Sequence, residues 1–164
     1  MSGPIPSRND IVGTAKKYLG VPFVHQGRTE KGLDCLGLVV RVAYDLDVMH
    51  LCIADAENQY DHRFNTYSRH PGGNFFRRML GQILTQVPIE EAKKGDVLFM
   101  TGDNWVHVGI KSGPDTMIHA YALKPGKVCE HRIDASWGGR LKCAFSWPFY
   151  HGDGPCLDLE LVNP

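Results

Sequence analysis

One cysteine stands where a polar, glycine-containing loop meets an unbroken apolar run, in the segment GLDCLGLVV at residues 32–40. Asp34 is a favourable N-cap residue, because its carboxylate accepts hydrogen bonds from the free N–H groups of a first helical turn. Cys35 is therefore predicted at the first position of a helix, where the helix dipole stabilises a thiolate and lowers the pKa of the thiol. This makes Cys35 a candidate nucleophile. The alternative is a small buried hydrophobic residue, the commoner role of a free cysteine.

Two of the eight histidines lie in segments with strand-like alternation, His107 within residues 106–110 and His119 within residues 117–120. A turn centred near Gly113 pairs His107 directly with His119 on one sheet face, with Cβ atoms about 4.5–5.5 Å apart. Two adjacent imidazoles suit a general base and the residue that orients it. His107 is predicted to take the proton of the cysteine thiol, and His119 to fix the tautomer and rotamer of His107.

Other interpretations of these residues remain open. Each histidine alone is more often a satisfied core or surface imidazole. Cys35, His107 and His119 have ligand types that suit a metal, but the sequence lacks the short-spaced ligand pairs typical of zinc sites. We therefore expect no metal and no cofactor. Gly109, beside His107, is predicted to leave room for the cysteine helix.

Composition indicates an ordinary globular chain of 164 residues, read as a single domain over 1–164 with its core at about 9–148 and a peripheral tail at 149–164. Eighteen basic residues balance 18 acidic ones, which disfavours nucleic acid and membranes as partners. Five scattered cysteines without a Cys-x-x-Cys motif argue against a disulfide framework. No signal-peptide pattern is present, so we expect synthesis in the cytoplasm and delivery by another route to a substrate outside it.

The hydrophobic pattern predicts an α+β domain, with helices first and an antiparallel meander second. Asn9 or Asp10 is expected to cap the first helix, and a surface excursion is expected at 50–66. Expected helices are 9–19, 35–48 and 75–84, with a one-turn element at 88–92, and the five expected strands are 97–100, 106–111, 116–121, 127–133 and 142–147.

Several motifs occur together in a fixed order over residues 9–148. They are Pro22-Phe23, DCLGLV at 34–39, GDVLF at 95–99, HVGI at 107–110 and IHA at 118–120. This order resembles the NlpC-type, papain-like cysteine endopeptidases of bacterial cell walls. His25-Gln26, Leu36 and the segment at 144–148 are closer to the peptidases encoded with phage tails and gene-transfer particles.

The resemblance implies a nucleophile helix packed on an antiparallel, five-stranded, barrel-like sheet. It implies Cys35 as nucleophile, His107 as general base and acid, and His119 as the orienting residue. The implied substrate is the peptidoglycan stem peptide, cut between γ-D-glutamyl and a diamino acid at the cell wall, with phage-tail proteins as further partners. Two alternatives remain: a non-catalytic tail-tip subunit, and a thiol amidase or acyltransferase acting on another substrate. The intact Cys/His/His set favours an enzyme.

The resemblance also suggests the substrate-binding residues Phe23, His25, Gln26 and Asp34. Phe23 replaces a tyrosine whose hydroxyl lies near the nucleophile in the family. Either the enzyme is slow and relies on the backbone N–H of Cys35 and on substrate binding, or His25 or Gln26 supplies the missing donor for the oxyanion, which is the favoured expectation. The alternative for both residues is a solvent-exposed loop position. Arg28 and Lys31 are the nearest cations in sequence for an acidic stem peptide, and a solvated pair is the alternative for them.

Overall fold

The computed structural model describes residues 4–52 and 67–151, so most of the predicted excursion at 50–66 and of the predicted tail at 149–164 lies outside the described residues. No helix in these two ranges is long and apolar enough to cross a membrane. The helices are α1 (Arg8–Lys16), α2 (Cys35–Asp45), α3 (Met49–Cys52), α5 (Gly73–Gly81) and α6 (Ala135–Gly138), with 3₁₀ turns η1 (Ile89–Glu91) and η2 (Pro148–Tyr150).

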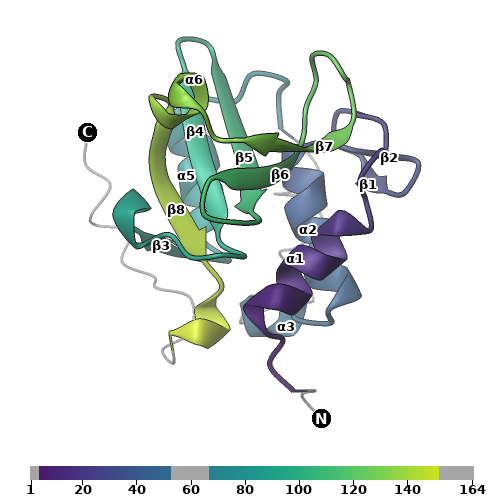
Figure 1. Cartoon of the computed structure of the whole chain (residues 1–164), viewed down its shortest axis with the longest axis vertical. Coiled ribbons are helices and arrows are strands. Elements are labelled where there is room, and N and C mark those ends of the chain that lie inside the picture. Colours follow the sequence, from purple (N-terminus) through teal and green to yellow (C-terminus); the bar gives the residue numbers. More distant parts are fainter. Residues whose placement is uncertain (1–3, 53–66, 152–164) are drawn as a thin grey trace.

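The main sheet has six strands in the order β3-β8-β4-β5-β6-β7, and every neighbouring pair is antiparallel (Figure 1). It is open, with β3 and β7 at its edges. The prediction of five strands is one short, because β3 is only three residues long and is recognisable mainly by its pairing with β8. The strands are β3 (Thr85–Val87), β4 (Val97–Gly102), β5 (Trp105–Lys111), β6 (Thr116–Ala120), β7 (Val128–Arg132) and β8 (Leu141–Ser146), and β1 (Arg28–Thr29) pairs with β2 (Gly32–Leu33) separately.

The pairing of β5 with β6 differs from the predicted register. Ile110 faces Ile118, so the turn is centred at Pro114 and not at Gly113. Continued along the strands, this register sets Gly109 opposite His119. The two predicted histidines still share a face, because the pairing shifts by two positions and the alternation of side chains has a period of two. A Cβ added at Gly109 would lie 3.1 Å from Sδ of Met117 and 3.3 Å from Cβ of His119, so Gly109 makes room for β6 and not, as predicted, for the cysteine helix.

Helix α2 begins at Cys35 as predicted and ends at Asp45, before the predicted Val48. The Asp34 carboxylate accepts a hydrogen bond from the backbone N–H of Gly37 at 2.7 Å, which caps the first turn. At the other end the backbone of Asp47 has a φ of 54°, which a right-handed helix does not accommodate. Figure 1 shows α2 beside α1 on one side of the sheet, and both helices also contact β5.

Helix α1 is shorter than predicted, and its cap lies earlier. Ser7 and Asp10 form a reciprocal capping box, in which Asp10 is the third helical residue and not the cap. Between α5 and the sheet, the buried ring of Phe76 stacks on Phe99, and Phe99 packs edge-on against Phe145.

Gly37 is required because another segment of backbone lies against α2 at this point. A Cβ at Gly37 would lie 2.0 Å from the carbonyl oxygen of Gly27, which itself accepts a hydrogen bond from Arg28. The loop before the cysteine therefore rests directly on the first turn of the helix.

We expect Gly37→Ala to lower the free energy of unfolding by about 1–3 kcal/mol, because either the loop or the helix must move to admit the methyl group. Gly13→Ala is the matched control, since nothing lies within 4 Å of a Cβ added there in α1. The control should raise stability by about 0.5–1 kcal/mol through the better helix propensity of alanine. Urea unfolding of both variants measures the difference, and equal effects would contradict the close contact between the loop and α2.

Candidate active site

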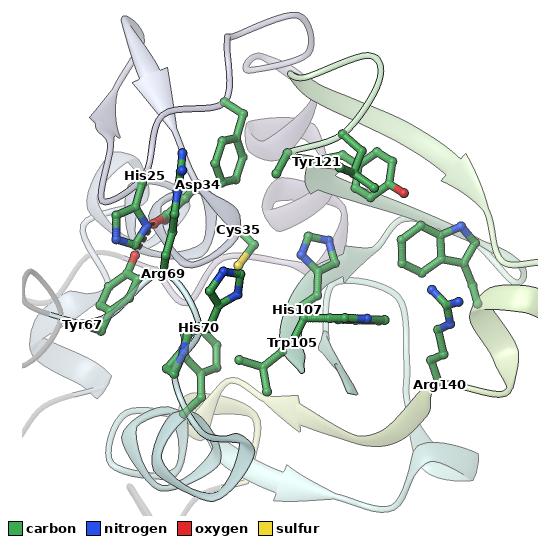
Figure 2. A pocket seen from close by; sticks show the side chains of 17 residues that line it. His25, Asp34, Cys35, Tyr67, Arg69, His70, Trp105, His107, Tyr121 and Arg140 are labelled. Carbon is green, nitrogen blue, oxygen red and sulfur yellow. Dashed lines mark hydrogen bonds and ion pairs between the residues drawn. The ribbon is translucent and has the colours of Figure 1, made fainter. Parts of the chain in front are cut away.

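A pocket of about 520 Å³ opens between the loop that precedes α2 and the β5 strand (Figure 2). Cys35 and His107 both line it. Cys35 reaches the pocket because it is the first residue of α2, and His107 because it alternates with the inward-facing Val108 on β5. The fold thus brings the predicted nucleophile and the predicted base to one cavity.

The environment of Cys35 favours the neutral thiol. Burial first, and then the adjacent Asp34 charge, raise the pKa of Cys35 to about 12. The backbone N–H groups of Val108 and Leu36 act in the opposite direction but are outweighed. The predicted lowering of this pKa is therefore wrong, because loss of hydration and a neighbouring carboxylate exceed the effect of the helix N-terminus.

His107 is held by a second imidazole. Its Nε2 lies 2.6 Å from Nδ1 of His119, and burial lowers the pKa of His107 to about 4. Since Nε2 is engaged by His119, Nδ1 is the nitrogen left to take a proton from Cys35. At neutral pH the pair is a thiol and a neutral imidazole.

The chain of imidazoles extends one residue further than predicted. His119 is fully buried, and its Nε2 lies 2.9 Å from Nδ1 of His131 on β7. If His107 keeps Nδ1 free as a base, its Nε2–H donates to His119, and the Nε2–H of His119 donates to His131. Sequence reasoning missed His131, although it lies in a predicted strand and two residues from Cys129, which pairs with His119.

Aromatic rings surround these imidazoles. Trp137 of α6 packs edge-on against His119 at a centroid distance of 5.3 Å, and Tyr121 lies 5.2 Å from the same ring. The pKa of His119 is lowered by burial and then by its two histidine neighbours. The rings therefore help to bury His119, and this burial disfavours its imidazolium form.

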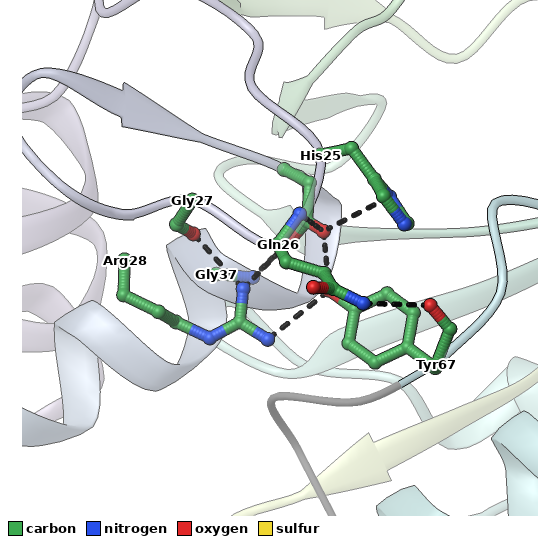
Figure 3. Close-up of polar contacts among 7 residues, drawn as sticks. His25, Gln26, Gly27, Arg28, Gly37 and Tyr67 are labelled. Carbon is green, nitrogen blue, oxygen red and sulfur yellow. Dashed lines mark hydrogen bonds and ion pairs between the residues drawn. The ribbon is translucent and has the colours of Figure 1, made fainter.

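The Asp34 carboxylate joins the loop that precedes α2, here called the pocket loop, to the first turn of α2. Figure 3 shows the residues that contact this carboxylate, among them Gln26, Gly37 and Tyr67. The Asp34 side chain is 3% exposed and accepts hydrogen bonds from the backbone N–H groups of Gly37 and Gln26, each at 2.7 Å. Nη1 of Arg28 lies 3.0 Å from Oδ1, and the hydroxyl of Tyr67 donates to Oδ2. One carboxylate thus joins three separate segments of the chain.

The predicted substrate-binding residues divide into two groups. Phe23, His25 and Asp34 line the pocket. Gln26 is not among the lining residues: its side-chain amide donates to the backbone carbonyl of Tyr67 at 2.8 Å. The Gln26 amide is therefore used in this hydrogen bond outside the pocket. Of His25 and Gln26, only His25 lines the pocket.

The cations that line the pocket are not the predicted ones. Arg28 is paired with Asp34, and Lys31 is exposed outside the pocket. Arg69 and Arg140 line the cavity instead. Sequence reasoning missed them because they precede α5 and β8 in loops whose place beside Cys35 depends on the tertiary fold.

Comparison with known proteins gives one family. The sequence pattern of the NlpC/P60 family matches residues 20–141. No protein with a curated description matches the sequence.

Solved structures show the same fold. The NlpC/p60 domain of the peptidoglycan hydrolase SagA is 23% identical with a TM-score of 0.58, and the match covers 86% of this chain and 99% of that one. An NlpC/P60 family protein from Bacillus cereus is 21% identical with a TM-score of 0.60, over 88% of this chain but only 41% of that one. The peptidoglycan hydrolase RipB from Mycobacterium tuberculosis is 20% identical with a TM-score of 0.51, over 89% and 72% of the two chains.

Asp34→Asn is expected to lower the free energy of unfolding by about 3 kcal/mol. It removes the negative charge that pairs with Arg28, and it replaces one acceptor oxygen by an NH₂ group that faces other hydrogen-bond donors. Asp115→Asn is the matched control, since its pair with Arg132 is exposed, at 54% and 80% for the two side chains. The control should change stability by less than about 1 kcal/mol. Thermal or urea unfolding measures both, and a small loss for Asp34→Asn would contradict the structural role of the carboxylate.

Proposed function

The chain belongs to the NlpC/P60 family, and from this premise we propose that it is a cysteine endopeptidase that hydrolyses peptidoglycan stem peptides. The proposed bond is the one between the γ-D-glutamyl residue and the diamino acid. The observation that carries the proposal is the shared pocket of Cys35 and His107, in which His107 is held 2.6 Å from His119. SagA and RipB, two proteins of similar fold, are peptidoglycan hydrolases, which supports this substrate class.

The proposed acylation begins with a neutral thiol. Nδ1 of His107 takes the proton from Cys35 as the sulfur attacks the carbonyl carbon of the scissile amide. The backbone N–H of Cys35, at the helix N-terminus, faces the oxyanion that develops. The His107 imidazolium then gives its proton to the departing amine, and the acyl group stays on sulfur as a thioester.

Deacylation repeats these steps with water. Nδ1 of His107 takes a proton from water, whose oxygen attacks the thioester carbon. The imidazolium returns the proton to the sulfur of Cys35 as the carboxylic acid product leaves. Throughout, Nε2–H of His107 donates to His119, which keeps the base in one tautomer and one rotamer.

The charges of the pocket suit an acidic stem peptide. Arg69 and Arg140 line the cavity, and Arg140 is held over the ring of Trp105 at 5.1 Å from its centroid. A carboxylate of the stem peptide is expected to pair with one of these guanidinium groups. His25, 3.9 Å from Asp34, is the proposed donor that replaces the phenol absent at Phe23.

Delivery by a phage-tail or gene-transfer particle to the cell wall is a further part of the proposal. It rests on the sequence resemblance at His25-Gln26, Leu36 and residues 144–148.

A second candidate function is stem-peptide binding without hydrolysis. It is favoured by the raised pKa of Cys35, which leaves little thiolate, and by the phenyl ring at Phe23. The presence of all three side chains that the reaction needs, Cys35, His107 and His119, favours the hydrolase. One experiment separates the two functions.

Purified peptidoglycan incubated with the full chain should release fragments with new termini at D-glutamate and at the diamino acid, identified by mass spectrometry. Cys35→Ala should lower the rate at least about 10³-fold, because no nucleophile remains. Cys143→Ala, which removes a buried thiol outside the pocket, is the matched control and should keep the activity.

Binding of intact stem peptide without any cleavage would establish the non-catalytic function. Cleavage retained in Cys35→Ala would assign the reaction to another nucleophile. Degradation of casein with peptidoglycan untouched would identify a general protease. Each of these results contradicts the proposed hydrolase.

A further inference from the structure

Three side chains with ligand atoms that zinc prefers meet behind the catalytic pocket, on β6 and β7. They are His119, Cys129 and His131. His119 is paired directly with Cys129 across the strands, and His131 follows two residues later on the same face of β7. One nitrogen or sulfur atom from each lies within 4.8 Å of the other two. The strand register, and not a flexible loop, sets this arrangement.

The distances are close to those of a tetrahedral zinc centre. Nε2 of His119 lies 2.9 Å from Nδ1 of His131, and Sγ of Cys129 lies 3.8 Å from Nε2 of His131. Zinc bonds of about 2.0–2.1 Å to nitrogen and 2.3 Å to sulfur set neighbouring ligand atoms about 3.3–3.6 Å apart. One ion takes only one nitrogen of His131, here Nδ1, and the three ligand atoms lie within 4.8 Å of one another. A side-chain movement of up to about 1.5 Å, made mainly by Cys129, therefore converts the hydrogen-bonded cluster into a site for the ion.

Access and surroundings also suit a metal ion. Cys129 and His131 are half-buried, so the outer side of the cluster reaches solvent while His119 forms its buried side. Three protein ligands leave a fourth position for water. Metal-bound histidines usually form a hydrogen bond through the ring nitrogen that does not bind the metal. His119 already has such a partner, because its Nδ1 lies 2.6 Å from Nε2 of His107.

We propose that His119, Cys129 and His131 bind a zinc ion, and that this ion switches off the catalytic base. Nε2 of His119 then holds the metal, so the proton of this imidazole moves to Nδ1 and donates to Nε2 of His107. The proton of His107 in turn lies on Nδ1, the nitrogen that must accept from Cys35. The base is thereby locked in the wrong tautomer.

The protons balance in this exchange. His107, His119 and His131 each keep one proton, with those of His107 and His119 moved from Nε2 to Nδ1. Cys129 binds as the thiolate and releases its proton to solvent. One proton is released for each zinc ion bound, and no redox step occurs.

The binding half of the proposal is independent of the proposed function, whereas the switch depends on it. Cobalt(II) chloride is added to the full chain, freed of metal with a chelator and kept reduced. We expect one cobalt ion per chain, with a thiolate-to-cobalt charge-transfer band that zinc abolishes by displacement. Cys129→Ser should remove the band, and His131→Gln should weaken cobalt binding at least about tenfold.

Two variants serve as controls for the position of the ion. His50→Gln removes an exposed histidine outside the cluster and should keep the band. Cys35→Ala should keep it as well, since Cys35 is not a ligand. No band in the parent, a band that persists in Cys129→Ser, or a band lost in Cys35→Ala would each overturn the site.

The switch is measured as peptidoglycan hydrolysis with zinc, relative to the same variant in chelator. Zinc should lower the rate of the parent at least tenfold and leave the relative rate of Cys129→Ser unchanged. Full zinc occupancy with undiminished hydrolysis would overturn the tautomer switch. If no variant hydrolyses peptidoglycan under any condition, the proposed function fails and the cobalt spectra still decide the metal site.

Discussion

The buried carboxylate of Asp34 is the interaction on which the geometry of the pocket depends. A carboxylate away from water is stable only when its oxygens are fully hydrogen-bonded or paired with charge. Here the carboxylate accepts hydrogen bonds from four groups. They are the backbone N–H of Gly37 in α2, the backbone N–H of Gln26, the guanidinium of Arg28 and the hydroxyl of Tyr67. Because these groups come from three segments, the first turn of α2 cannot move relative to the pocket loop without leaving a charge unpaired.

This arrangement has an electrostatic cost at the adjacent residue. The charge that fixes the start of α2 is next to Cys35, and together with burial it keeps the thiol neutral. The same dry environment keeps His107 neutral, and the rings of Tyr121 and Trp137 extend that environment to His119. In the proposed reaction, proton transfer to His107 therefore accompanies attack by the sulfur, and the orientation of His107 by His119 decides whether the base faces the thiol.

The sequence was sufficient for the parts of the site that depend on local chemistry. Asp34 as a cap, Cys35 at the first helical position and the strands that carry His107 and His119 all follow from residue types and periodicity. The exact register between β5 and β6 does not follow from the sequence, because a turn centred at Gly113 and one centred at Pro114 fit the same residues. His107 and His119 still lie together, because a shift of two positions keeps both side chains on the same face of the sheet.

Other features depend on contacts between distant segments, which residue patterns do not encode. Tyr67, Arg69 and Arg140 come from irregular loops, and His131 joins the histidine chain only through the pairing of β6 with β7. The direction of the Cys35 pKa depends on how deeply the folded chain buries the sulfur. An N-terminal helix position is visible in sequence, whereas desolvation is not.

We infer that His107 rests as a neutral base with its proton on Nε2. Nitrogen-15 NMR of histidine-labelled protein, with chelator present and His107 assigned by loss of its signals in His107→Gln, tests this directly. Because burial lowers the pKa of His107 to about 4, we expect a neutral imidazole with a protonated Nε2 and an unprotonated Nδ1 at pH 6, with protonation of Nδ1 only as the pH falls toward 4. An imidazolium at pH 6, titrating at or above the ordinary histidine pKa of about 6.5, would contradict it.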